Sequence, residues 1–312
     1  MFDIYVDSAG NLTEDMIKET GVKVIPFTYT SSGVEKSCFE EGVPFAQTAK
    51  QFYEDMVQGA DIKTSLIGEV KFIETITPSM QQGRDVLLIT ITSTLSGTHA
   101  QALKAQKALK EAFPDRKMYV VDSANASLGE GLFAVEAAKM RDGGSSIDEC
   151  YNWIEENKYK MNSFVTINEL KYLRKSGRVS TITAVAGAIL NIKPMLKADA
   201  NDPATLAVYS KERGRKRSID ALVREFTDRV IDPANQTIAI THCDCAAEAE
   251  ELAERLKALG AENIAIEFYD LCTGSHVGPG TIALFFFGKD RRETSETASE
   301  PRKLSKVFRP RG

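Results

Sequence analysis

The sequence predicts an α/β protein of two domains, each holding a mostly parallel or mixed sheet flanked by helices. The chain has 312 residues, a length typical of two domains of ordinary size. Apolar residues make up 43% and charged residues 27%, which is the balance of a soluble globular protein. Strand-like and helix-like segments alternate along the chain, and this order favours parallel strands with both sheet faces covered by helices.

The first domain is expected over residues 1–160. A buried strand at 2–6 ends in a turn, and Thr13 is a suitable N-cap for the helix that follows. Pro114 and the pair Gly143-Gly144 provide stop signals for two later helices. Strands are expected at 2–6, 22–29, 85–92 and 118–121, and helices at 13–20, 44–58, 70–82, 98–113 and 129–142.

The second domain is expected over residues 161–288, after a helix at 147–157. Gly260 ends its last long helix. Strands are expected at 163–166, 206–209, 237–242, 264–269 and 281–287, and helices at 170–176, 218–231 and 246–259. Residues 289–312 are charged and lack periodicity, so we expect a disordered tail there.

Charge and cysteine content narrow the class of protein. The net charge is −5, so no global basic field attracts nucleic acid. The basic run 211–217 is expected to be a solvated face rather than a docking patch. No apolar run approaches the ~20 residues that span a bilayer, and the segment after Met1 is strand-like rather than a leader. Five scattered cysteines favour reduced thiols, and we expect a cytoplasmic protein.

No metal or cofactor is expected. Cys243 and Cys245 lie beside His242, but their spacing is not that of a zinc site. Residues 129–134 match the pattern G-x-G-x-x-A, although the preceding strand ends too early for a dinucleotide turn. Phosphate-loop and nucleophile-elbow patterns are absent from the sequence.

The segment 85–102 carries the strongest indication of a ligand site. It reads as a buried strand, a loop rich in Ser, Thr and Gly, and then a helix. The carboxyl end of such a strand is where open α/β sheets bind ligands. Ser96, Gly97 and Thr98 offer hydroxyls, close backbone approach and the amides of a helix N-terminus, which together suit an anion. Simple capping of the helix by Ser96 or Thr98 explains the same residues equally well.

Three further groups stand beside this loop as candidates. The hydroxyl pair Thr64-Ser65 precedes a predicted helix and serves either as a cap or as a second anion contact. His276 lies before a Gly-Pro-Gly turn and offers a donor to a carboxylate, or has a structural role. Arg174 and Arg178 belong to a local basic surface that suits an acidic or phosphate-bearing partner.

Four segments of the chain together resemble signatures of the DegV family. They are Ile4-Tyr-Val-Asp-Ser8, Leu95-Ser96-Gly97-Thr98, the stretch 170–178 and His276-Val-Gly-Pro-Gly280, which occur in the family's order over residues 1 to about 288. The chain departs from the family where Thr64-Ser-Leu-Ile-Gly68 stands in place of Thr-Ser-Gln-Pro-Ser. That departure leaves the contacts of the first loop open.

The resemblance implies a function. DegV proteins bind a long-chain fatty acid between two α/β domains, and some are the lipid-binding subunit of a fatty acid kinase whose separate ATP-binding subunit phosphorylates the carboxylate. By resemblance, Thr64 or Ser65 and Ser96 hold the carboxylate, His276 joins their hydrogen bonds, and Arg178 faces the kinase. The protein itself is then not an enzyme and has no catalytic residues. Transient contact with a membrane is compatible with this role.

Two other functions remain open. One is a free-standing hydrolase or phosphatase that uses the Ser96 loop. The other is a carrier of a different anionic lipid, without a kinase partner. Small apolar residues at 184–190 either line a tunnel for the ligand or belong to the ordinary core.

Overall fold

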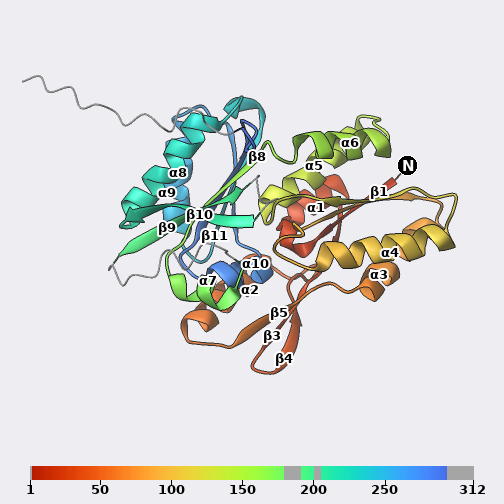
Figure 1. The fold of residues 1–312 in the computed structure, drawn as a ribbon, viewed down its shortest axis with the longest axis horizontal. Coiled ribbons are helices and arrows are strands. Elements are labelled where there is room, and N and C mark those ends of the chain that lie inside the picture. Colours follow the sequence, from red (N-terminus) through yellow and green to blue (C-terminus); the bar gives the residue numbers. More distant parts are fainter. Residues whose placement is uncertain (1, 179–190, 200–204, 294–312) are drawn as a thin grey trace, which may run out of the picture.

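The computed structural model describes residues 2–178, 191–199 and 205–293. Two α/β units lie side by side and contain three sheets (Figure 1). The predicted fold class is confirmed. The apolar segment at 184–190 and residues 294–312 of the expected tail lie outside the described residues.

The first unit is built on a four-stranded parallel sheet in the order β2-β1-β6-β7. These strands are β1 (Phe2–Asp7), β2 (Lys23–Ile25), β6 (Asp85–Thr90) and β7 (Met118–Asp122). All six residues of β1 are buried, as expected for a strand covered on both faces.

Helices cover both faces of this sheet. In Figure 1, α5 and α6 lie on one side of it and α3 and α4 on the other. The helices are α1 (Glu14–Thr20), α3 (Glu69–Gln81), α4 (Thr98–Ala112), α5 (Leu128–Asp142) and α6 (Ile147–Asn157). The predicted cap is present, since the Thr13 side chain accepts a hydrogen bond from the Met16 amide.

A small antiparallel sheet, ordered β4-β3-β5, and helix α2 (Phe45–Val57) are inserted between β2 and β6. Its strands are β3 (Thr28–Ser31), β4 (Val34–Ser37) and β5 (Ile62–Ser65). The single strand predicted at 22–29 is therefore wrong. Pro26, which has no amide proton for a sheet ladder, separates β2 from β3, and the two strands join different sheets.

The second unit is built on a six-stranded mixed sheet in the order β10-β9-β8-β13-β11-β12. Only β11 and β12 pair in parallel among the described strands of this sheet. The strands are β8 (Met161–Thr166), β9 (Ile192–Asp199), β10 (Thr205–Arg213), β11 (Thr237–His242), β12 (Asn263–Phe268) and β13 (Ile282–Phe287). The helices are α7 (Leu170–Ser176), α8 (Arg215–Arg229), α9 (Ala246–Lys257) and α10 (Leu271–Val277).

Helix α10 was not predicted, because the segment at 271–277 holds Thr, Gly and Ser, which favour helix interiors weakly. Tertiary packing decides its conformation. A Cβ atom on Gly274 would lie 1.9 Å from the Tyr53 hydroxyl, so only glycine lets α10 approach α2 this closely. The Asp270 side chain caps the helix by accepting from the Thr273 amide at 2.8 Å.

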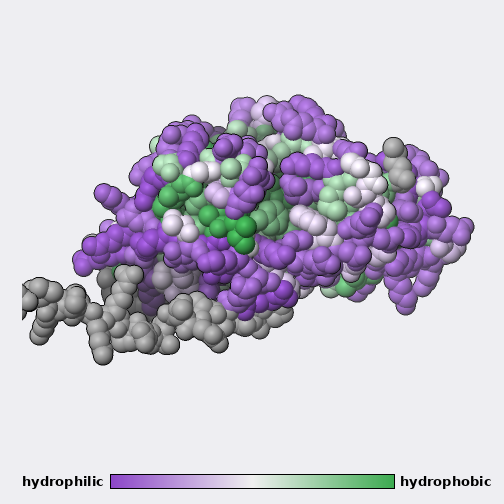
Figure 2. Space-filling view, turned by 90° about the horizontal axis from the view of Figure 1, so that it is seen from above, coloured by the Kyte–Doolittle hydropathy of each residue, from purple (hydrophilic) through white to green (hydrophobic). Residues whose placement is uncertain are grey.

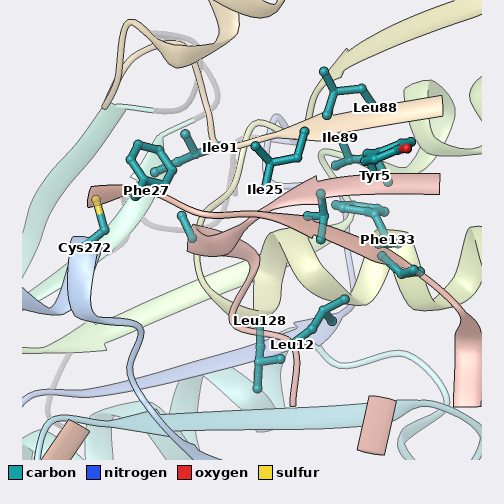
Figure 3. Close-up of a cluster of buried hydrophobic side chains, with 14 of the residues drawn as sticks. Tyr5, Leu12, Ile25, Phe27, Leu88, Ile89, Ile91, Leu128, Phe133 and Cys272 are labelled. Atoms are coloured by element: carbon teal, nitrogen blue, oxygen red, sulfur yellow. The ribbon is translucent and has the colours of Figure 1, made fainter. Parts of the chain in front are cut away.

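The buried core consists of two clusters, one that spans both units and one that lies within the second unit. One cluster joins residues of the four-stranded sheet to β11, α10 and β13 of the second unit. In Figure 3, Phe27, Ile91 and Cys272 gather at one end of this cluster. The face of the molecule in Figure 2 is mostly hydrophilic, with hydrophobic side chains collected near its middle. The apolar end of the core marked by Phe27 and Cys272 leads directly to the cavity described next.

Candidate functional site

A cavity of about 250 Å³, the main cavity, lies where the two units meet. The first unit contributes the ends of β5 and β6, and the second contributes α7, β10 and α10. The predicted site residues that line it are Thr64, Ser65, Ser96, Gly97, Arg178 and His276. The fold therefore brings together segments separated by more than two hundred positions.

Two loops of the first unit form the hydroxyl-bearing wall. Ser65 ends β5, and Ser96 lies just before α4. The loops are direct neighbours, because the Ile67 amide donates to Thr98 Oγ1 at 3.4 Å. A Cβ atom on Gly97 would lie 3.3 Å from the Leu66 side chain. The small size of Gly97 therefore keeps the backbone of its loop close to β5.

The hydrogen bonds of Ser96 allow its hydroxyl proton to point at a ligand. Its Oγ accepts from the Thr98 amide at 3.2 Å and lies 2.9 Å from Thr98 Oγ1. When Thr98 donates to it, both lone pairs of the Ser96 oxygen are occupied, so its own proton can be donated elsewhere. Thr98 is fully buried and does not line the cavity. It positions Ser96 rather than contacting a ligand.

The N-cap residue of α4 is Gly97, which has a helical conformation and no side chain to cap the helix. Ser96 Oγ accepts from the first amide of the helix, that of Thr98, so the Ser96 hydroxyl serves the helix N-terminus as well as lining the cavity. The first turn of α4 adds the positive end of its dipole to this wall of the cavity.

His276 lies in the last turn of α10 rather than in the expected loop. Its Nε2 atom is 3.1 Å from Thr64 Oγ1. Burial, with a smaller contribution from the nearby charge of Arg178, lowers the pKa of His276 from 6.5 to about 4. The ring is therefore neutral at neutral pH, with one nitrogen that donates and one that accepts.

Arg178 lines the cavity, whereas Arg174 does not. Arg178 follows α7, where its amide donates to Ser176 Oγ at 3.2 Å and its guanidinium to the Ser176 carbonyl at 2.5 Å. Arg174 is exposed on the same helix. The sequence predicted only a surface contact for Arg178. Its place in the cavity wall was missed because sequence spacing alone does not show which side of α7 faces the cavity.

A second cavity of about 280 Å³, the outer cavity, shares a wall with the main cavity. The shared residues are Thr64, Ser176, Arg178 and His276. Lys63 and Lys175 also line the outer cavity, and both pair with Asp61, at 3.2 and 2.8 Å. The outer cavity therefore presents two lysines and Arg178 beside the polar wall.

The opposite side of the main cavity is apolar, with Phe27, Ile91 and Val277 among its walls. Beside it lies a chamber of about 30 Å³, the end cavity. The two share Leu95, Ala126, Leu206 and Tyr269. Outer, main and end cavities thus form a series that passes from basic through polar to apolar surroundings.

Three fully buried carboxyl groups, Asp7, Glu130 and Asp270, lie near the boundary between the units. Burial raises the pKa of Asp7 and of Asp270 to about 7 and that of Glu130 well above its usual value. Backbone amides of Ala9 and Ile91 donate to Asp7 at 3.0 and 2.8 Å. Neither oxygen of the Glu130 carboxyl has a hydrogen-bond partner among the described residues, and burial together with the nearby carboxyl of Asp7 favours its protonated form.

The glycines at 129–134 serve packing rather than a dinucleotide. A Cβ atom on Gly131 would lie 2.0 Å from the Gly10 carbonyl oxygen, and one on Gly129 would lie 2.7 Å from the Phe285 ring. These glycines therefore let α5 pack closely against both units.

Within the described ranges, no group of three or more His, Cys, Asp or Glu side chains is arranged to hold a metal ion. His242, singled out with the two cysteines, instead accepts from the Cys245 amide at 3.3 Å and packs on Phe268. No helix in residues 2–178, 191–199 or 205–293 has the length and apolar character needed to cross a membrane.

A family model and a curated relative point to the same family. The sequence model of a family described as "Uncharacterised protein, DegV family" matches residues 1–289. A DegV domain-containing protein of Clostridium perfringens is 36% identical over 288 residues, which cover 92% of this chain and 97% of that protein.

Solved structures resemble the fold over nearly the whole chain. A DegV lipid binding protein from Thermotoga maritima has a TM-score of 0.80 at 26% identity, covering 93% of this chain and 100% of the other. A second Thermotoga maritima protein, whose structure is described as revealing a fatty acid binding function, has a TM-score of 0.78 at 25% identity. That similarity covers 91% of this chain and 98% of the other.

Proposed function

The chain belongs to the DegV family, and from that premise we propose that it is a carrier of a long-chain fatty acid and does no chemistry on it itself. The observation that carries the proposal is the cavity series, with polar side chains at one end and apolar walls behind them. Both Thermotoga maritima neighbours, described as binding lipid or fatty acid, support it.

The carboxylate of the ligand binds at the wall shared by the outer and main cavities. Ser96 donates its free hydroxyl proton, and the neutral pair Thr64 and His276 supplies a further donor. Arg178 adds positive charge beside them. A carboxylate that left water without such partners would be strongly disfavoured, so these groups fix the orientation of the ligand.

The acyl chain supplies most of the binding free energy. Each buried methylene contributes roughly 0.8 kcal/mol, so a chain of palmitate length brings on the order of 10 kcal/mol before ordering costs. The apolar walls around Phe27, Ile91 and Leu206 are suited to receive it. Leu66, half exposed at the rim of the main cavity, offers an apolar edge for entry from a membrane.

More specifically, the protein is the lipid-binding subunit of a fatty acid kinase in the cytoplasm. The outer cavity leaves the carboxylate end open to a partner, and the side chains of Lys63, Lys175 and Arg178 favour the approach of phosphate groups. A separate kinase subunit transfers the terminal phosphoryl group of ATP to a carboxylate oxygen, giving acyl phosphate for phospholipid synthesis and ADP. Arg174 and Arg178 belong to the surface that contacts this partner.

Two measurements test the proposal. The first is native mass spectrometry of the protein purified without detergent, where we expect the mass of one fatty acid. An empty protein that hydrolyses esters or phosphate esters by itself would indicate the hydrolase alternative instead. The second is incubation with an ATP-binding kinase subunit and ATP. Acyl phosphate formation supports the kinase role, and its absence from a lipid-loaded protein leaves a carrier of another kind.

A further inference from the structure

The far end of the cavity series is closed by a loop at residues 123–127. Ala124, Asn125 and Ala126 of this loop line the end cavity, opposite Ser163 and Val165 of β8. The end cavity holds about 30 Å³, against about 250 Å³ for the main cavity. The position of this loop therefore decides how far a chain that enters past Ala126 can extend.

The loop has a backbone conformation that needs external support. Ala124 has a φ of 54° and Ser127 a φ of 55°, in the left-handed region that residues other than glycine adopt at a cost. Such conformations persist when surrounding contacts over-determine them. The contacts that hold this loop are consequently as important as the residues that form it.

Asn125 is the centre of those contacts. Its amide nitrogen donates to the carbonyls of Ser123, at 2.8 Å, and Lys158, at 3.2 Å. Its oxygen accepts from Ser163 Oγ at 2.9 Å and from Arg291 Nη1 at 3.1 Å. All four hydrogen-bonding positions of the amide are used, so Asn125 has none left for a ligand and serves as structure.

Arg291 contacts Ala124, one of the two residues with a left-handed backbone conformation. Its Nη2 donates to the Ala124 carbonyl at 2.6 Å, and its Nη1 also lies 3.3 Å from the Met161 carbonyl. The guanidinium stacks over the Tyr159 ring, with 5.4 Å to the centroid. The planar guanidinium addresses several acceptors at fixed angles, which a lysine ammonium cannot do.

Arg291 lies two positions beyond the end of the family match at residue 289. The backbone after β13 is nevertheless ordered, because the Lys289 amide donates to the Arg229 carbonyl and the Arg291 amide to the Tyr159 carbonyl, at 2.9 and 3.0 Å. Residues expected to begin a disordered tail thus place a side chain against the loop that lines the end cavity.

Resting on the proposed function, we infer that Arg291 is a positioning residue that sets the maximum length of the bound acyl chain. It does so by fixing the 123–127 loop across the end of the cavity series. Without its hydrogen bonds, Ala124 relaxes from its left-handed conformation and the end cavity opens. Longer chains are then accommodated, while the carboxylate contacts at the opposite end are unchanged.

The expected change is in chain-length preference rather than in overall affinity. Each additional methylene that becomes buried raises affinity about 4-fold. For the variant Arg291→Ala, a gain of two methylenes therefore raises the affinity for stearate or arachidate about 10-fold or more relative to myristate. Arg291→Lys keeps the charge over Tyr159 but loses the two-nitrogen contact, so it should shift the preference in the same direction to a smaller extent.

The test is competition of myristate, palmitate, stearate and arachidate against a fluorescent fatty acid, with the full-length protein. The control is Arg292→Ala, which removes an exposed neighbour that pairs with Asp290 at 2.6 Å and also lies over Tyr159, at 4.4 Å from the ring centroid. Its side chain hydrogen-bonds to Asp290 and not to the 123–127 loop. We expect the length preference to shift in Arg291→Ala, in part in Arg291→Lys, and not in the control. If Arg291→Ala does not fold, Arg291→Lys alone decides the result.

A wild-type length preference in a folded Arg291 variant overturns the inference and leaves the proposed function intact. Failure of the wild-type protein to bind any of the four acids overturns the proposed function, and the inference with it. The two failures are therefore distinguishable in one experiment.

Discussion

The two ends of the cavity series use similar polar residues for opposite purposes. At the near end, Ser96 is arranged so that its proton remains available. At the far end, every hydrogen-bonding position of Asn125 is occupied by protein groups. An arginine stands at both ends, with Arg178 beside two cavities and Arg291 bound to backbone carbonyls.

A polar residue in a cavity wall indicates a ligand contact only when it has hydrogen-bonding positions that protein groups do not occupy. A satisfied group rigidifies the wall, and an unsatisfied group selects the ligand. On this criterion, the near end is the one suited to a charged ligand group, and the proposed role of the far end is to limit chain length.

The largest expected effect comes from blocking the passage between the two ends with Ala126→Phe. Ala126 lines both the main and the end cavity, so the ring should exclude the last part of a long chain. Excluding about four methylenes lowers affinity for palmitate roughly 200-fold, while a medium-length acid is affected far less. Isothermal titration of both ligands measures this.

The control for that change is Ala112→Phe, which adds the same ring at the exposed end of α4. It should leave both affinities unchanged. Equal losses for the medium and the long acid in Ala126→Phe would contradict a chain that passes this residue.

A smaller effect is expected at the near end from Ser96→Ala. Loss of a hydrogen bond to a charged group costs about 1.5 to 3 kcal/mol, or roughly 10- to 100-fold in affinity. The loss should be the same for palmitate and stearate, because Ser96 contacts the carboxylate and not the chain. The matched control is Ser93→Ala, an exposed hydroxyl of the same loop that does not line the cavity. Unchanged affinity in Ser96→Ala would refute its assignment as a ligand contact.

The arginines near α7 should separate binding from phosphorylation. Arg174→Ala removes an exposed charge outside the cavities, so we expect unchanged fatty acid affinity and about a tenfold lower kcat/KM with the kinase subunit. Arg178→Ala should lower both quantities. Arg217→Ala, in the basic run 211–217, is the control and should change neither. A tenfold loss in that control would show that the partner uses this run.

The smallest net effect is expected on the pH dependence of stability, because two groups of residues oppose each other. His276 has a folded pKa of about 4, against an ordinary value of 6.5. Between these values the unfolded chain binds more protons, so this contribution to stability falls on acidification, by up to about 3 kcal/mol. Asp7 and Asp270 have raised pKa values of about 7, so their contribution is lost as pH rises toward 7.

Denaturant unfolding at several pH values separates the two contributions. On acidification from pH ~6.5 to ~4, wild type should lose stability relative to His276→Gln. It should gain stability relative to Asp7→Asn over the corresponding range. Parallel pH profiles of wild type and His276→Gln would contradict the burial of a neutral imidazole.

Part of this arrangement was predictable from sequence. The buried strand β6, its Ser/Thr/Gly loop and α4 form a continuous local pattern, so the position of Ser96 and Gly97 at a strand's carboxyl end followed from periodicity alone. The proximity of Thr64 required β5, which was not predicted because a four-residue edge strand with alternating exposure resembles a turn. His276 lies on α10, whose conformation depends on its packing against Tyr53 rather than on helix propensity.

Other features had no local signal. Sequence patterns treat charged residues as solvent-exposed, so the burial of Glu130 and Asp7 was not predicted. Arg291 stands in a charged segment without periodicity. Only the three-dimensional course of the chain past Tyr159 brings it to the 123–127 loop. Residues that act through contacts with distant parts of the chain leave no local pattern in the sequence.

The most direct test of the account is a crystal structure of the protein purified with its own lipid. We predict a single elongated ligand with its carboxylate within hydrogen-bonding distance of the Ser96 hydroxyl. Its chain should run past Ala126 and stop at Ala124. A ligand that lies elsewhere, or one that places its carboxylate beside Ala124, would contradict the assignment of the two ends.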